Sequence, residues 1–314
     1  MSKRSSEHYV APVDENEQIE VDAVRLGDRR SNLWLDAWRD LRRRPLFYVA
    51  LTIVAVVALA AAWPTLFTQV APNNDCALSL SNAGPEAGHP LGYTRQGCDV
   101  YSRVVWGART SLSVGMLVVL ITAVIGIPMG AIAGFFGGKV DSILSRIGDI
   151  FFSIPYFLAA IVVMSVLADH RNVLTISFAI GGFAWASLAR IVRAEVLRIK
   201  NLEYVTASTA VGRSRFSTLV GHVLPNSLTP VIVTLTIGLG AAIVAEAALS
   251  FLGIGLNTSV MSWGNDISQA QVTIKTAPMA LFWPSLFLTI TVLAFIMLGE
   301  LIRDALDPKA RARR

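Results

Sequence analysis

The chain has 314 residues, of which 54% are hydrophobic and 16% are charged. Because a soluble domain carries about 25% charged residues, this deficit indicates that much of the surface faces lipid, and it excludes an ordinary soluble protein. The net charge of +5 comes with no pattern typical of RNA or DNA binding, so nucleic acid is not an expected partner. We attribute the charge to membrane topology and to contact with anionic lipid headgroups.

The first 45 positions divide into two parts. Residues 1–30 are polar and mixed in charge, and we expect them to be a disordered cytoplasmic N-terminus. Residues 31–45 predict an amphipathic helix that lies on the inner membrane surface, with arginines opposite its apolar side. The apolar residues that recur at helical spacing are Leu33, Trp34, Ala37, Trp38 and Leu41.

Long uncharged runs dominate the rest of the sequence. They lie at 46–74, 110–138, 150–168, 172–189, 223–245 and 276–299. A helix that crosses the hydrocarbon core of roughly 30 Å needs about 20 apolar residues, and each run can supply them. The sequence therefore predicts an all-α, polytopic membrane protein with six transmembrane helices in a membrane domain over 46–304. The polar segment before the first run is too long for a cleavable signal peptide, so this span is expected to remain as an anchor.

The distribution of Lys and Arg predicts the orientation. If both termini are cytoplasmic, the inner segments 1–45, 139–149, 190–222 and 300–314 hold 22 of the 27 basic residues. The outer segments hold the remaining five, which are Arg95, Arg103, Arg109, Arg171 and Lys275. This asymmetry follows the positive-inside rule. We therefore expect a cytoplasmic N-terminus and a basic cytoplasmic tail at 305–314.

The first outer segment, 68–107, is long and rich in Asn, Gly, Pro and Ser. A loop of this length is functional or disordered in most proteins, and this one is large enough to contact an external partner. Both cysteines of the chain, Cys76 and Cys98, fall within it. An oxidising compartment would allow a disulfide between them, whereas the alternative is two unrelated free thiols.

Small residues recur every four positions in the second span, at Gly126, Gly130, Gly134 and Gly138. Such spacing lets two helices approach closely in lipid. The spacing fits two interpretations, an interface with another spanning helix and simple packing within the chain.

Signatures of an enzyme are missing. The segment nearest to a phosphate-binding loop, Gly137-Gly138-Lys139-Val140, lacks the hydroxyl residue that would meet Mg²⁺. The sequence contains neither HExxH nor GxSxG, and its four histidines are scattered over four segments. We therefore expect no catalytic residue, no metal site, no cofactor and no ATP hydrolysis by this chain.

The inner segment 195–225 has a pattern of its own. Asn201 is placed to cap a helix, and Glu203 falls in the first turn, where the helix dipole favours a carboxylate. Gly212 permits a sharp turn, a second short helix is expected at 213–221, and Pro225 suits the first turn of the next span. Two short helices at an angle predict a compact knob whose exposed apolar and basic side chains a soluble partner would cover.

This segment resembles the EAA loop of ABC-importer permeases, in which a pattern close to E-x-x-x-A-A-x-x-x-G precedes L-P. Ser208 departs from the second alanine of the pattern. The matching positions are Glu203, Ala207, Ser208, Gly212, Leu224 and Pro225.

Further strings resemble the C-type permease subunit of dipeptide, oligopeptide and nickel importers, over about residues 31–308. They include residues 42–45 (RRRP), 89–92 (HPLG), 107–112 (GARTSL), 246–253 (EAALSFLG) and 263–264 (WG). The outer motif departs from the family's LGTDxxGRD, since Tyr93 and Thr94 replace Thr-Asp and Cys98 replaces Arg. The replacement at Cys98 favours a bond to Cys76.

The resemblance implies a complex in the inner membrane of a bacterium. Its other members would be a homologous second permease subunit, two cytoplasmic ABC ATPase subunits and an extracytoplasmic substrate-binding protein. Coupling to the ATPases would fall on Glu203, Ala207, Ser208, Gly212, Arg213, Phe216, Leu224 and Pro225. The implied function is import of di- or oligopeptides, although nickel complexes and other solutes use similar permeases and the sequence does not choose among them.

Carboxylates near the ends of spans have two interpretations. Glu246 is a candidate for lining the translocation path, or a structural carboxylate that bonds a neighbour. Asp149 is expected to pair with Arg146, and Glu300 with Arg303. An ion-coupled secondary transporter is the alternative function, but it would need coupling carboxylates near mid-membrane.

Overall fold

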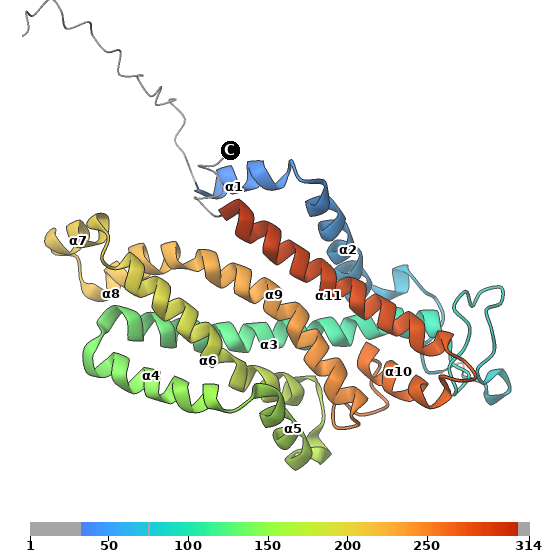
Figure 1. Cartoon of the computed structure of the whole chain (residues 1–314). Helices are drawn as coiled ribbons and strands as arrows, with labels where there is room; N and C mark the ends of the chain where they lie inside the picture. Colours follow the sequence, from blue (N-terminus) through green and yellow to red (C-terminus); the bar gives the residue numbers. More distant parts are fainter. Residues whose placement is uncertain (1–32, 75, 307–314) are drawn as a thin grey trace, which may run out of the picture.

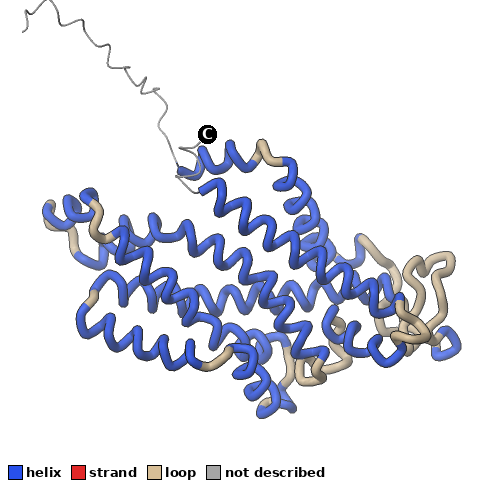
Figure 2. The backbone as a smooth tube through the Cα atoms, viewed as in Figure 1, coloured by secondary structure: helices blue, strands red, loops and turns tan. Residues whose placement is uncertain are grey.

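The computed structural model of the protein describes residues 33–74 and 76–306. The predicted N-terminal segment 1–30 and most of the predicted tail 305–314 lie outside this range. Helices account for most of the described chain, as Figure 2 shows, and the all-α prediction is confirmed for this part of the protein. The helices are α1 (Leu33–Leu41), α2 (Pro45–Ala62), α3 (Val100–Phe136), α4 (Gly138–Ser153), α5 (Tyr156–Val166), α6 (Val173–Ile199), α7 (Glu203–Ala210), α8 (Arg215–Thr218), α9 (Leu224–Phe251), α10 (Trp263–Ala270) and α11 (Met279–Leu306).

Five of the helical segments are long and apolar enough to cross a membrane. Four of them are α2, α3, α6 and α11, and the fifth is the segment Arg215–Phe251, which includes both α8 and α9. The third predicted span, 150–168, is not one helix. It is divided between α4 and α5, which are bent by 75° relative to each other. The break at Ile154 and Pro155 agrees with the restriction that a proline imposes on itself and on the residue before it. Six spans result if this bent pair crosses the membrane as one unit.

The glycines of the second span pack within the chain. A β-carbon on Gly126, Gly130 or Gly134 would lie 2.9, 2.3 or 2.9 Å from a carbonyl oxygen of α6. Their absence of side chains therefore allows α3 and α6 to lie side by side at close range, as Figure 1 shows. Gly138, by contrast, has a positive φ at the start of α4 and open space around it.

The N-terminal helix α1 packs on the end of α11. Ala37 and Leu41 are buried in a cluster with Leu298 and Leu306, whereas Trp38 remains exposed. Arg44 bonds both Asp40 (2.7 Å) and Asp304 (2.9 Å), which ties the α1–α2 elbow to α11. A nine-residue helix, Leu33–Leu41, thus lies within the predicted segment 31–45, and the amphipathic role of this segment at a membrane surface remains a prediction.

Candidate functional site

Helices α7 and α8 form a knob, residues 203–218, that projects at one end of the molecule between α6 and α9 (Figure 1). One side chain anchors it, because Val205 is 3% exposed and lies in an apolar cluster with Ile199 and Leu219. Glu203 occupies the first turn of α7, as predicted. Asn201 does not cap the helix; its amide donates to the carbonyl oxygen of Leu197 instead (3.1 Å).

Gly212 turns the chain between α7 and α8 with a φ of +89°. No atom lies within 4 Å of the position that a β-carbon would take. A side chain at this position would therefore meet no steric clash. The turn favours glycine because of its backbone conformation, which costs L-residues about 1–2 kcal/mol. It does not need glycine for lack of space.

Polar contacts hold the second half of the knob in place. The Ser214 hydroxyl accepts from the Ser217 backbone N–H and so caps α8. Arg213 folds back, donating through Nε to Ser217 Oγ (2.8 Å) and through Nη1 to Nε2 of His222 (2.6 Å). The Ser208 and Thr218 hydroxyls lie 3.5 Å apart, at the long end of hydrogen bonding. Ser208, the residue that departs from the EAA pattern, therefore lies between the two short helices.

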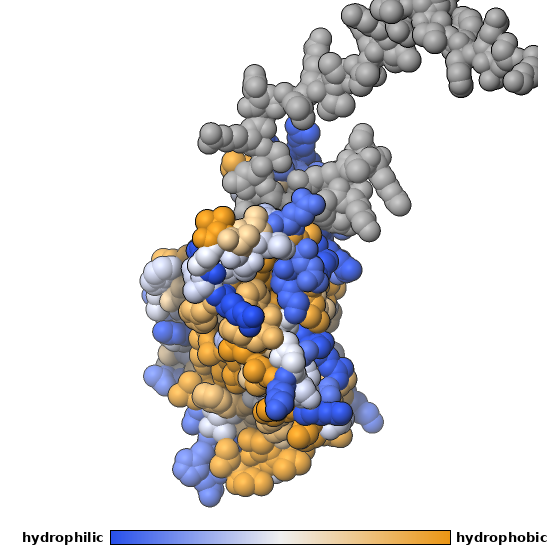
Figure 3. All heavy atoms as spheres, turned by 90° about the vertical axis from the view of Figure 1, so that its left-hand side faces the viewer, coloured by the Kyte–Doolittle hydropathy of each residue, from blue (hydrophilic) through white to orange (hydrophobic). Residues whose placement is uncertain are grey.

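The knob presents apolar surface to solvent. Val211 and Phe216 are 87% and 67% exposed, and Tyr204 is also exposed. Viewed from this end, apolar residues lie uncovered between margins of hydrophilic side chains (Figure 3). Six of the eight predicted coupling residues are exposed here, and Ser208 and Leu224 are half-buried. The structure thus places these eight residues at one end of the molecule.

The base of the knob is braced by ion pairs. Arg193 of α6 makes two bonds of 2.6 Å to Asp141 of α4, and Lys200 donates to the carbonyl oxygen of Gly134 (2.7 Å). Such bidentate Arg–carboxylate pairs are strong and directional. The basic residues of α6 were visible in the sequence only as an inner charge excess, and their partners lie too far along the chain for spacing to reveal them.

The predicted ion-pair partner of Asp149 is wrong. It pairs with Arg190 of α6 (2.8 Å) rather than with Arg146. Both side chains are about half exposed, so the pair contributes little to stability. Glu300 and Arg303 do approach each other, at 3.7 Å, as predicted.

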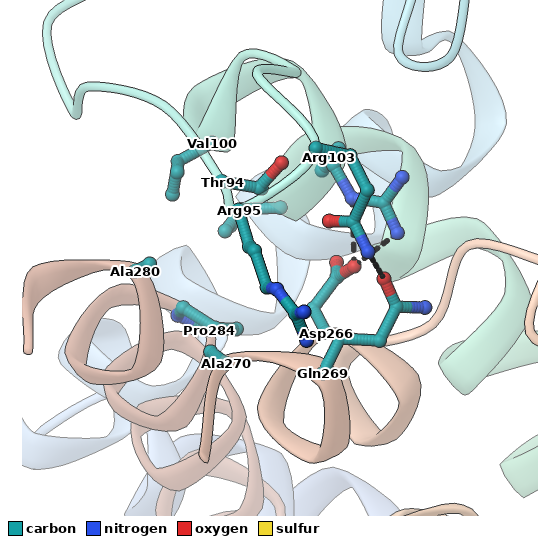
Figure 4. A pocket seen from close by; sticks show the side chains of 11 residues that line it. Thr94, Arg95, Val100, Arg103, Asp266, Gln269, Ala270, Ala280 and Pro284 are labelled. Carbon is teal, nitrogen blue, oxygen red and sulfur yellow. Dashed lines mark hydrogen bonds and ion pairs between the residues drawn. The ribbon is translucent and has the colours of Figure 1, made fainter. Parts of the chain in front are cut away.

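At the opposite end, the outer segment packs on α10. Figure 4 shows Arg103 of α3 and Asp266 of α10 pointing toward each other, and Arg103 Nε donates to Asp266 Oδ1 (2.8 Å). Both side chains are buried. Arg103 also bonds Asn73 (2.6 Å), and Gln96 bonds Gln269 (3.1 Å). These contacts connect the outer segment to α3 and α10.

Internal bonds order the outer segment itself. Cys76 and Cys98 form a disulfide. Burial and the hydrogen bond to Glu86 raise the pKa of Tyr93 to about 12, so its hydroxyl stays a donor at neutral pH. His89 Nδ1 lies 3.1 Å from Asp99 Oδ1. The described part of this segment is therefore folded, although before α3 begins at Val100 its only helical element is the 3₁₀ turn Leu78–Leu80.

Glu246 is fully buried, at 0% exposure. Its carboxylate accepts from Ser111 (3.0 Å) and Ser250 (2.9 Å), and so joins α3 to α9. In this conformation it reaches no surface, which favours the structural interpretation of this carboxylate over a place on the translocation path. No cluster of three potential metal ligands occurs in the described part of the chain.

The fold defines a multi-pass membrane protein with an exposed apolar knob at one end and an ordered loop segment at the other. Residues 126–312 match the family described as binding-protein-dependent transport system inner membrane component. Residues 32–85 match the N-terminal transmembrane domain of oligopeptide transport permease C. The chain therefore belongs to the permease subunits of ABC importers, and within them to the C-type subunits.

Curated relatives agree with this assignment, and a solved structure shares the fold. The dipeptide transport permease DppC of Bacillus subtilis is 38% identical over 88% of this chain and 86% of its own length. The oligopeptide permease OppC of the same organism is 35% identical over 92% and 94%. The glutathione permease GsiD of Pectobacterium atrosepticum is 33% identical over 89% and 92%. An inward-facing structure of the MetNI methionine ABC transporter has a similar fold, with a TM-score of 0.54 and 22% identity over 65% of this chain and 96% of the other.

Proposed function

We propose that this protein forms half of the translocation pathway of an importer for di- or oligopeptides, and that its α7–α8 knob couples this pathway to a separate ATPase. The observation that carries the coupling role is the anchored but uncovered knob. Val205 is buried at its base while Val211 and Phe216 stand 87% and 67% exposed. A patch of this kind on a fixed support is typical of a surface that a partner covers.

The mechanism follows from how the knob is connected. Its apolar anchor shares one cluster with the inner ends of α6 and α9. A displacement of the knob would therefore move α6 and α9 directly, and the Arg193–Asp141 ion pair would transmit the movement to α4. When the ATPases close on ATP, the knob would carry this motion into the spans and switch the pathway from outward-open to inward-open.

The remaining parts of the complex complete the proposal. A homologous second permease subunit would supply the other half of the pathway, and two cytoplasmic ABC ATPase subunits would hydrolyse ATP. The ordered outer segment would receive an extracytoplasmic substrate-binding protein. Both termini would lie on the cytoplasmic side of a bacterial inner membrane, in agreement with the excess of basic residues in the inner segments.

Peptides are the proposed substrates because the curated relatives are named as dipeptide, oligopeptide and glutathione permeases. The chain carries no pattern that selects one peptide over another. Nickel complexes remain the substrate class that a transport assay has to compare with peptides.

The docking role is tested with Phe216→Ser in the assembled complex. Removing the exposed ring should lower ATPase co-purification and coupled ATP hydrolysis, while membrane insertion stays normal. Leu78→Ser is the matched control for ATPase co-purification, because Leu78 is also a large apolar residue and is 80% exposed, but lies in the outer segment. Equal ATPase binding by Phe216→Ser and wild type would argue against the knob as the docking surface.

A further inference from the structure

Two helices form the walls of a long groove on the described surface. On α6 the wall residues follow one stripe, Ala184, Ser187, Ile191, Glu195 and Arg198. The facing stripe on α9 holds Asn226, Pro230, Thr234, Gly238 and Ala241. Residues three and four apart share one helix face, so each stripe is continuous along its helix.

Two cavities occupy this groove. The first, of about 750 Å³, begins near the base of the knob and is bounded by α6, α9 and α11. The second, of about 180 Å³, lies deeper between α3, α5, α6 and α9. Both are lined by Thr234 and Gly238. These two residues, one turn apart, therefore mark the junction at which the two cavities adjoin.

The chemistry of the groove changes along its length. Charged side chains, Glu195, Arg198 and Arg303, line only the cavity near the knob. The deeper cavity has an uncharged lining that includes the hydroxyls of Thr122 and Ser187. Thr122 Oγ1 is enclosed and has no hydrogen-bond partner among the described residues. An unpaired hydroxyl in an apolar span is costly, which favours a polar occupant over a lipid chain.

Gly238 faces open space at the place where the two cavities adjoin. Nothing lies within 4 Å of the position of a β-carbon on this residue. Gly240, two residues further on, faces the other way, and its β-carbon would lie 3.4 Å from the carbonyl oxygen of Val292 in α11. Gly240 thus serves helix packing, whereas packing within the chain gives Gly238 no reason to be small.

We infer that Gly238 is a size-determining residue of the solute pathway, at a junction that admits neutral or zwitterionic peptide-like solutes past hydroxyl groups. The inference rests on the proposed permease function. A side chain at this position would extend into the space where the two cavities adjoin and would narrow it in proportion to the volume of the side chain, because nothing lies within 4 Å of the β-carbon position. The effect on transport should therefore grow with both the size of the substituent and the size of the solute.

The first test measures transport in vesicles that contain the complete complex with wild-type, Gly238→Ala or Gly238→Leu chains. Radiolabelled glycylglycine and diphenylalanine are the two probes. We expect Gly238→Leu to reduce diphenylalanine uptake at least about tenfold more than glycylglycine uptake, because the added side chain occupies space that the larger solute needs. Gly182→Leu is the matched control, because Gly182 also has open space within a helix but lines neither cavity. An unchanged ratio of the two uptakes would overturn the inference.

The second test needs no substrate. The two native cysteines are joined in a disulfide, so Gly238→Cys introduces a single free thiol into this subunit. A membrane-impermeant maleimide should label it about tenfold faster than the thiol of Gly182→Cys, since only a hydrated thiol ionises and reacts. Equal labelling, or labelling by lipid-soluble reagents alone, would overturn the pathway assignment. Failure of the proposed function would look different, because the wild-type complex itself would then show no ATP-dependent uptake.

Discussion

Substitutions at Gly212 test whether the turn requires glycine for its backbone conformation or for its lack of a side chain. Its φ of +89° and the empty surroundings of its β-carbon position mean that any penalty arises from the backbone alone. Ala should disfavour the native turn by about 1–2 kcal/mol, which corresponds to a factor of roughly 5–30 in its population. Val should cost more because β-branched residues rarely adopt positive φ, and Asn should cost least.

The assay is the coupled ATP hydrolysis of the purified complex, together with the amount of ATPase retained. We expect activity to fall in the order wild type, Asn, Ala, Val, while the membrane content of the subunit stays constant, since α6 and α9 do not depend on this turn. Gly148→Val is the control, because Gly148 has equally open space but an ordinary φ. Undiminished coupled activity in Gly212→Val would refute the reasoning.

Three further changes probe the scaffold. Gly130→Val should separate α3 from α6, because its β-carbon would lie 2.3 Å from the carbonyl oxygen of Ala189; a melting temperature equal to that of wild type in detergent would contradict this. Arg103→Met should strand the buried Asp266 carboxylate and cost about 3–5 kcal/mol, and the stability of the purified protein should recover when Asp266→Asn is added; no recovery would speak against the pair. Cys76→Ser should loosen the outer segment by about 3 kcal/mol, seen as faster proteolysis there, and cleavage at the wild-type rate would show that the disulfide is dispensable.

Much of the architecture was predictable because it depends on local signals. Long apolar runs indicated the spans, and Gly212 and Pro225 marked the turn and the start of α9. The break between α4 and α5 was not predicted, since hydropathy along 150–168 stays high across Pro155 and hides the 75° bend. The spacing of the glycines indicated close packing of the second span but left its partner open, and only the structure shows that this partner is α6.

Contacts between residues far apart in the sequence could not be predicted for either site. Arg103 and Asp266 are separated by 163 positions, and no spacing rule connects residues so far apart. Asp149 was assigned to Arg146, three residues away, because a helix favours such neighbours, yet α4 packs against α6, whose Arg190 lies 2.8 Å from Asp149. The knob was predictable because its residues are consecutive. The groove between α6 and α9 was not, because its two walls come from helices whose packing the sequence does not specify.

The most direct measurement of the central claim is reconstitution of the chain into vesicles, alone and with its second permease subunit, ATPases and external binding protein. The account predicts that a labelled dipeptide accumulates only in the complete system and only with ATP, and that it accumulates more slowly when the Gly212→Val chain replaces wild type. Uptake by the purified chain alone, driven by an ion gradient without ATP, would contradict it and favour the ion-coupled transporter.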